Sequence, residues 1–182
     1  MTTAPTTVST WAIDPVHSIA EFAVKHMMVS TVKGRFGSVA GTLSIDEASP
    51  LRSSVTASID VASIDTHEPQ RDAHLRSDDF FNAEQFPHIT FRSTRIERIS
   101  DEEWRITGDL TIRDMTQVVM LKAEFEGRVT DPYGKERAGF TAETTLSRKE
   151  FGLKWNALLE TGGAVVGDKV KVTLNLEAVR ED

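Results

Sequence analysis

The sequence is dominated by a hydrophobic alternation of period two, which recurs from the first tryptophan to the C-terminal end. The clearest run covers residues 170–178, where valine, leucine and alanine alternate with lysine, threonine, asparagine and glutamate. Successive side chains of a β-strand point to opposite faces of its sheet, so each such run predicts a strand with one apolar face. Further strands are predicted within residues 20–26, 55–61, 89–91, 104–113, 119–129 and 140–146.

Short polar segments separate the runs, among them "VKGRFG", "EASPL", "ISDEE" and "DPYGKE". We interpret these segments as turns, and short turns favour antiparallel neighbours because parallel strands need a longer crossover connection. About eight strands of this kind must hide their apolar faces, either by stacking two sheets or by closing one sheet into a barrel. The interior of a small closed barrel is either filled by side chains or holds one small ligand.

The length of 182 residues suits a single domain, and 39% hydrophobic residues are enough for a sizeable core. Residues 1–10 are rich in threonine, alanine and proline, which predicts a flexible arm. We therefore expect one barrel domain over residues 11–182.

Charge and composition exclude several kinds of partner. The net charge of −7 would repel phosphate backbones, so no nucleic-acid partner is expected. The chain has no cysteine, which excludes disulfides and thiolate chemistry. No apolar run approaches the ~20 residues of a membrane span, so stable membrane insertion is not expected. Because the first residues lack the basic and apolar regions of a secretory leader, we expect a cytoplasmic protein.

One stretch, residues 71–87 with the sequence "RDAHLRSDDFFNAEQFP", breaks the alternation. Pro69 suits the first turn of a helix, and the polar residues after it suit the helix body. We predict a short helix that lies as a lid on the barrel mouth, where Arg71 and Asp72 form charge-assisted bonds to a strand end. The apolar residues that need the mouth as a surface are Leu75, Phe80, Phe81 and Phe86.

The same stretch could also be a metal site. His67 and His74 share a helix face seven residues apart, with Asp72 between them. Two helical turns separate such residues by roughly 10 Å, however, which is too far for one ion. We therefore assign no metal ligand and no cofactor.

Catalytic motifs are absent. The sequence has no nucleophile elbow and no phosphate-binding glycine loop, so we predict a protein that is not an enzyme and assign no catalytic residue. The alternative left open is a barrel enzyme that acts on a small apolar substrate, with His26 or the pair Asp72 and His74 as acid–base groups. His26 falls on the apolar face of its strand, where it could also be a hydrogen-bonded core residue.

Several segments, in this order, resemble the YceI-like (polyisoprenoid-binding protein) family. They are "DPVHSIAEFAVKHMMVSTVKGRFG", "SIDT", "RDAHLRSDDFFNAEQFPHITFRS", "GDLTIRD", "SRKEFGL" and "VGDKVKVTLNLEA". The resemblance runs from Trp11 to the last strand. One departure is Asp114, which stands where the family usually carries glycine and where we expect a turn residue with positive φ.

The resemblance implies an all-β, lipocalin-like antiparallel eight-stranded β-barrel that acts as a homodimer and carries a long isoprenoid lipid in an apolar tunnel. Phe80 and Phe81 would close the mouth. His26 is included among the ligand-binding residues because of its place on the apolar strand face, where it could face the head of a ligand. The residues expected to line the tunnel are Phe22, Val24, Phe91, Trp104, Ile106, Leu121, Phe125, Phe140, Val172 and Leu174.

We therefore expect a carrier or storage protein for a long apolar lipid, either a polyisoprenoid or an isoprenoid-quinone tail. Burial of one CH₂ group contributes about 0.8 kcal/mol, so a few five-carbon units suffice for micromolar affinity without charged recognition. A barrel filled by its own side chains, with only protein partners, is the remaining alternative.

Overall fold

The computed structural model describes residues 8–157 and 165–181. The strands are β1 (Val8–Ile13), β2 (Ile19–His26), β3 (Ser30–Phe36), β4 (Val39–Asp46), β5 (Ser54–Asp60), β6 (Ile64–Asp65), β7 (His88–Arg98), β8 (Glu103–Ile112), β9 (Met115–Thr130), β10 (Glu136–Ser147) and β11 (Val166–Arg180). The helical elements are α1 (Pro69–Arg76) and the 3₁₀ turns η1 (Pro50–Arg52), η2 (Val61–Ser63) and η3 (Arg148–Phe151).

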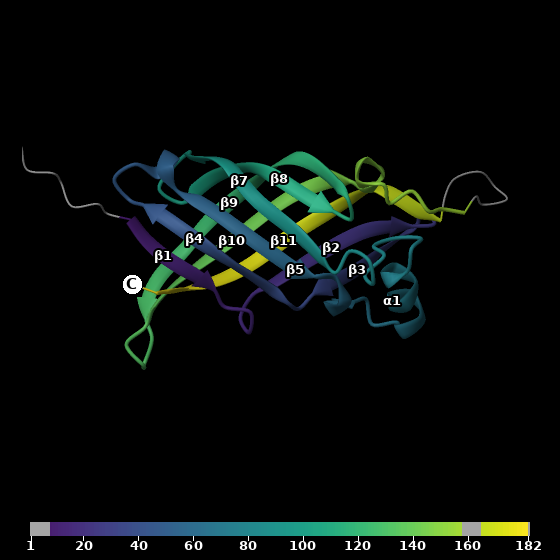
Figure 1. The fold of residues 1–182 in the computed structure, drawn as a ribbon, viewed down its shortest axis with the longest axis horizontal. Coiled ribbons are helices and arrows are strands. Elements are labelled where there is room, and N and C mark those ends of the chain that lie inside the picture. The colour runs from purple at the N-terminus through teal and green to yellow at the C-terminus, as the bar shows by residue number, and fades with distance from the viewer. Residues whose placement is uncertain (1–7, 158–164, 182) are drawn as a thin grey trace, which may run out of the picture.

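These strands form one antiparallel sheet that closes on itself (Figure 1). The order is β1-β4-β5-β7-β8-β9-β10-β11, and the end of β11 pairs back with β1. This eight-stranded closed barrel confirms the predicted fold class. Closure leaves these strands without a free edge, which is how small antiparallel sheets hide their backbone groups.

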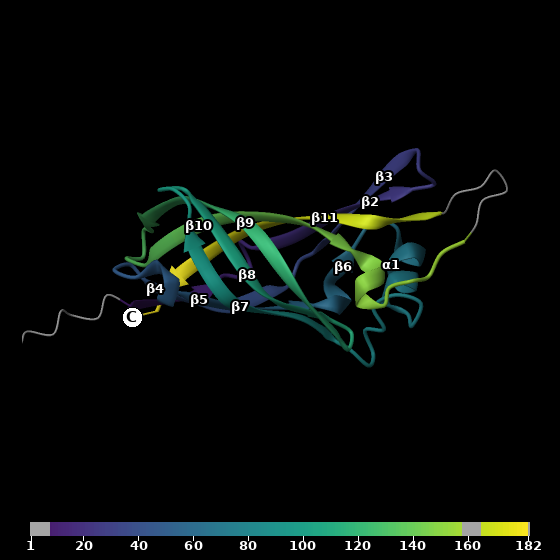
Figure 2. The same cartoon turned by 90° about the horizontal axis from the view of Figure 1, so that it is seen from above.

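The remaining three strands extend the barrel wall at one end. β2, β3 and β6 continue the lines of β1, β4 and β5 after short breaks, and β2 pairs with the first half of β11. β6 pairs with β3 alone, so the sheet has an edge there. α1 packs against β6 at this end of the barrel (Figure 2).

Two expectations from the sequence are wrong in detail. The segment "VKGRFG" is not a turn, because most of it forms β3, where Val32 and Phe36 pair with Val24 and Ala20. The predicted arm ends earlier than residue 10, since β1 begins at Val8 and pairs with β4. Residues 1–7 lie outside the described part of the chain.

The predicted helix is present. α1 begins at Pro69 after Glu68, whose side chain accepts hydrogen bonds from the backbone N–H groups of Gln70 and Arg71. Two orphan N–H groups of the first turn are thereby satisfied, and proline at the first turn removes a third. Within the described residues, no helix is long and apolar enough to cross a membrane.

Buried residues gather at the two ends of the barrel. Trp11 is fully buried at the end opposite α1, where the Arg128 guanidinium lies 5.0 Å from its ring centre. At the α1 end, Phe151 and Val61 are at most 1% exposed and belong to a cluster that includes the lid residue Phe80. Both ends of the barrel are therefore closed by well-packed side chains.

The close packing of β4 against β5 can be tested at Gly41, with the nearby Gly37 as a comparison. A β-carbon on Gly41 of β4 would collide with the Thr56 carbonyl oxygen and approach the Ala57 Cα to 2.9 Å, whereas nothing lies within 4 Å of one on Gly37. Because backbone atoms of β5 cannot move aside, we expect Gly41→Ala to lower the free energy of unfolding by about 1–3 kcal/mol.

Gly37→Ala should leave stability unchanged or raise it by up to about 1 kcal/mol, since the backbone there is not left-handed. Urea unfolding followed by tryptophan fluorescence compares the two variants. Equal midpoints would contradict the packing described for β4 and β5.

Candidate functional site

The middle of the barrel has an inner row that alternates large and small side chains. Trp104, Ala123, Ala142, Leu174 and Ala20 are consecutive cross-strand partners on β8, β9, β10, β11 and β2. Directly paired residues point to the same face of a sheet, so all five face the interior. Ala123 and Ala142 form a buried cluster with Leu121, and the large side chains of Trp104 and Leu174 pack against it.

The predicted tunnel residues all lie on this inner face. Only Leu121 is fully buried, and the other nine keep part of their surface exposed. Inward-facing residues of a closed barrel either fill its interior or line a site for one small ligand, and these side chains form a continuous apolar inner face. The structure brings together Phe22, Val24, Phe91, Trp104, Ile106, Leu121, Phe125, Phe140, Val172 and Leu174.

Aromatic contacts join the lid to the lumen wall. The Phe81 ring meets Phe36 edge-on at 5.7 Å, and Phe36 lies 5.6 Å from Phe22. Phe80 is buried and packs instead on Trp155 at 5.4 Å. Phe81 therefore faces the wall, while Phe80 fixes the lid to the segment after η3.

Charged side chains anchor α1 as the sequence predicted. Asp72 is buried and accepts hydrogen bonds from the backbone N–H and the hydroxyl of Thr66, the residue that follows β6. Arg71 donates to the hydroxyl and the carbonyl oxygen of the same threonine. The helix is thus pinned to the strand end at one residue.

The turn between β8 and β9 forms a second anchor, which the sequence did not reveal. Arg113 donates to the carbonyl oxygens of Asp78 and Phe80 in the lid, both at 3.1 Å. The left-handed residue of this turn is Arg113, with φ of 56°, and not Asp114 as expected. Its hydrogen bonds to the lid offset the strain of this backbone conformation.

Arg148 of η3 is the third anchor. It is 4% exposed and donates to the carbonyl oxygens of Leu153, Trp155, Val166 and Gly167. Burial lowers the pKa of this guanidinium, although it stays charged at neutral pH. These bonds hold the segment that carries Trp155 against the lid. The sequence "SRKEFGL" contained the residue but gave no sign of its partners.

The proposed acid–base and metal residues do not form a site. Asp72 binds Thr66, whereas His74 Nε2 lies 2.8 Å from Asp79 Oδ2, so Asp72 and His74 do not act as a pair. In the part of the chain that is described, His67 and His74 do not meet in any cluster of metal-ligand type. His26 is half-buried at the end of β2, on the same strand face as Phe22 and Val24.

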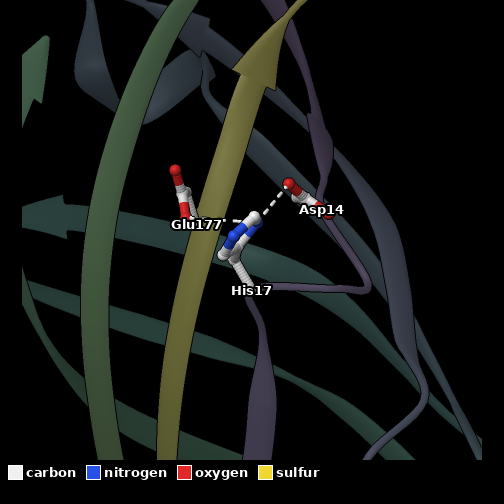
Figure 3. Close-up of side chains that lie close together, drawn as sticks. All are labelled: Asp14, His17 and Glu177. Atoms are coloured by element: carbon white, nitrogen blue, oxygen red, sulfur yellow. Dashed lines mark hydrogen bonds and ion pairs between the residues drawn. The ribbon is translucent and has the colours of Figure 1, made fainter. Parts of the chain in front are cut away.

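A cluster that the sequence did not predict lies outside the barrel, where the chain bends between β1 and β2 (Figure 3). His17 Nδ1 lies 2.8 Å from Asp14 Oδ2 and 3.7 Å from Glu177 Oε2. These three residues have the donor types of a metal site. Arg137, however, already donates to Asp14 at 2.9 Å and to Glu177 at 3.3 Å, so the cluster is an ion network that ties the bend to β10 and β11.

The network shifts two pKa values in opposite directions. The hydrogen bond with His17, supported by one from Arg137, lowers the pKa of Asp14 to about 2. The same bond to Asp14, together with the negative charge of Glu177, raises the pKa of His17. The ion pair therefore persists to a higher pH than the ordinary pKa of histidine would allow.

A hollow of about 540 Å³ opens on the outer surface beside this network. It lies where Gly127 of β9 and Gly139 of β10 face each other, because two residues without side chains leave the wall thin. Its surroundings include Arg137, Glu126 and Glu177. Such polar neighbours do not suit an apolar chain, so the barrel interior is the better candidate site.

A closed antiparallel barrel with an apolar inner face and a helical lid defines a lipocalin-like β-barrel protein. The model of the YceI-like domain matches residues 11–178 of the sequence. The chain belongs to the YceI-like family, as its motifs predicted.

Curated relatives agree with this assignment. A UPF0312 protein of Pseudomonas aeruginosa (strain LESB58) is 38% identical over 165 residues, which cover 91% of this chain and 83% of that protein. Protein YceI of Escherichia coli O157:H7 is 36% identical over the same lengths.

Solved structures share the fold. BcnA of Burkholderia cenocepacia superposes with a TM-score of 0.79 at 22% identity, covering 91% of this chain and 98% of that one. The YCEI protein of Campylobacter jejuni gives 0.70 at 29% identity, with coverage of 87% and 90%. A polyisoprenoid binding domain from Saccharophagus degradans gives 0.69 at 14% identity, with coverage of 94% and 98%.

The ion network predicts a pH-dependent stability. Because the pKa of His17 is higher folded than unfolded, protonated His17 stabilises the fold below its ordinary pKa of about 6.5, and this contribution is lost as the pH rises through the raised value. Asp14 acts oppositely: its contribution is lost as the pH falls from the ordinary aspartate range toward about 2.

We expect His17→Gln to remove the loss on the alkaline side, seen as a smaller fall in unfolding free energy between weakly acidic and alkaline pH than in the unchanged protein. The other histidines are common to both proteins, so the difference isolates His17. Urea unfolding over this pH series measures it, and parallel curves would contradict the role given to the network.

Proposed function

We propose that the protein binds a long apolar lipid of the polyisoprenoid or isoprenoid-quinone type inside the barrel and acts as its carrier or store. The observation that supports this most directly is the inner wall, whose large apolar residues face one another without being fully buried. An apolar inner face suits a ligand without charge along its length.

The energetics are sufficient for such a ligand. A five-carbon isoprene unit contributes roughly 3–4 kcal/mol on burial at about 0.8 kcal/mol per carbon group, before ordering costs. Micromolar affinity needs about 8 kcal/mol, so a few buried units provide it. None of the predicted wall residues is charged. Their contribution to the binding free energy does not depend on how far the lipid extends beyond the lumen.

Fold relatives support the same ligand class. The domain from Saccharophagus degradans is described as polyisoprenoid binding, and its fold covers 94% of this chain. At 14% identity this likeness concerns the fold, so the ligand is carried over here as a proposal. The lid over the lumen fits a protein that shields its cargo from water.

We propose no catalytic role and no cofactor. Asp72 and His74 have separate structural partners, Thr66 and Asp79, and each bond helps to hold the lid. His26 lies near the lid end of the barrel, where it would contact the head of a ligand. An enzyme would lose turnover on substitution of His26 or His74, whereas a carrier would keep its lipid.

Following the family resemblance, we also propose that the protein acts as a homodimer. The outer face of β9 offers an apolar surface for a second copy, with Val118 71% and Met120 52% exposed. Sedimentation equilibrium of the purified protein gives the mass directly, and a monomer at all concentrations would exclude this arrangement.

Native mass spectrometry of the gently purified protein, followed by denaturing extraction, tests the cargo. We expect a retained species of isoprenoid mass at one copy per binding site. A protein that is empty and also fails to take up added polyprenol or quinone would contradict the proposal.

A matched pair of variants on β10 locates the site. Thr144 faces the lumen beside Val172, whereas Thr145 faces outward beside Lys171. Thr144→Trp should occupy part of the lumen and weaken lipid binding about tenfold, because the loss of roughly two buried CH₂ groups costs about 1.4 kcal/mol. Thr145→Trp should keep the lipid content, and equal occupancy in the two variants would place the ligand elsewhere.

A further inference from the structure

The hairpin of β2 and β3 stands away from the barrel at the end where α1 lies (Figure 2). Its tip is apolar and exposed: Met27 is 42%, Met28 71% and Val29 84% accessible to solvent. Neighbouring large apolar residues at the tip of a turn are unusual, because turns are ordinarily polar.

The backbone of this tip is unfavourable for its residues. Met27 and Met28 both have left-handed φ values, 52° and 63°, and the Val29 N–H donates to the His26 carbonyl oxygen at 3.2 Å. This is the pattern of a type I′ turn, which strongly prefers asparagine and glycine at its two central positions. Methionine does not favour this turn conformation. The preference of the turn for asparagine and glycine is thus violated at an exposed site, as is typical of functional surfaces.

Lysines surround the base of the tip on the outer face of β2, β3 and β11. Lys33 and Lys171 are both aligned with Ala23 in the register, and all four lysines of this group are exposed. Within residues 8–157 and 165–181, none of the four forms an ion pair with a carboxylate. The group consists of Lys25, Lys33, Lys169 and Lys171. In a chain of net charge −7, this is a local positive surface.

We propose that this tip docks on the surface of a lipid bilayer that contains anionic lipids. Met27, Met28 and Val29 enter the interface between headgroups and acyl chains, and the four lysines meet the phosphate groups around it. The lid segment after α1 carries exposed carboxylates at Asp78 and Asp79, so the contact is confined to the hairpin.

Docking would bring the lid end of the barrel close to a source or acceptor of apolar cargo. That purpose depends on the proposed lipid carrier function, but the contact itself does not. A second copy of the chain could also cover an apolar tip. The lysines argue against this occupant, because two equal positive surfaces would repel each other.

Sedimentation of the whole protein with vesicles tests the contact. The vesicles are pure phosphatidylcholine or an equimolar mixture of phosphatidylcholine and phosphatidylglycerol, at low and high salt. We expect binding to the mixed vesicles that weakens at high salt, and little binding to pure phosphatidylcholine. A protein that stays in the supernatant with mixed vesicles at low salt overturns the proposal.

The double variant Met27→Asn with Met28→Gly restores the preferred turn residues while it removes two of the three apolar side chains. It should unfold at a higher urea concentration than the unchanged protein, which shows that it folds, and should bind mixed vesicles about tenfold more weakly. The matched control is Tyr133→Asn, in the β9–β10 turn away from the lid end, where Tyr133 is 89% exposed (Figure 1). It should bind as the unchanged protein does.

Unaltered vesicle binding by the double variant overturns the proposal. The proposal is also overturned if the unchanged protein forms a concentration-dependent dimer and the double variant does not, since a second copy would then cover the tip. Lipid extracted from the same preparations separates the two proposals. A double variant that keeps its cargo but loses vesicle binding supports docking, whereas an empty protein that still binds vesicles contradicts only the carrier function.

Discussion

The rest of the structure depends on the backbone pairing of β11. This strand pairs with β10 along most of its length, with β2 through its first half and with β1 at its end, so it closes the sheet. Closure fixes which alternate residues face inward, and the wall is held by hydrogen bonds between strands and does not rely on core packing alone.

The two ends of the barrel are held by different interactions. Trp11 under the Arg128 guanidinium fills one end with packed side chains. The other end is held by charged groups that bind backbone carbonyls and one threonine: Arg113, Arg148, Arg71 and Asp72. Polar bonds at defined positions therefore keep the lid in place independently of how tightly the interior behind it is packed.

Local sequence pattern was sufficient for β2, β5, the strands β7 to β11 and the lid, because period-two alternation and helix-start signals depend on near neighbours, but it did not mark out β1, β4 or β6. It failed at β3, since Gly34 was taken as a turn residue. In the structure, a β-carbon at Gly34 would overlap the Phe22 ring, so glycine allows close packing inside a strand. The inward-facing set followed from alternation, and its assignment to a tunnel came from the family resemblance and stays a prediction.

The anchors of the candidate site could not be predicted in the same way. Arg137 meets Asp14 across 123 positions of sequence, and Arg148 binds carbonyl groups, which every residue type carries. The residue with left-handed backbone in this turn is Arg113, and not Asp114 as the sequence predicted. The hydrogen bonds of the Arg113 guanidinium to the lid outweigh the local preference for aspartate. These hydrogen-bond partners and this turn conformation are determined by tertiary contacts, which leave no periodic pattern or motif in a single sequence.

The edge at β6 has one more consequence. Past the contact between the Val61 N–H and the Pro87 carbonyl oxygen, no ladder joins β6 to β7 in the described chain, and α1 covers the edge of β6. The extension of the wall formed by β2, β3 and β6 therefore ends in an open edge beneath the lid, whereas the eight barrel strands stay closed. Separating α1 from this edge would break side-chain contacts and the hydrogen bonds to Thr66 but no sheet hydrogen bonds, so the lid can open locally while the closed part of the wall stays folded.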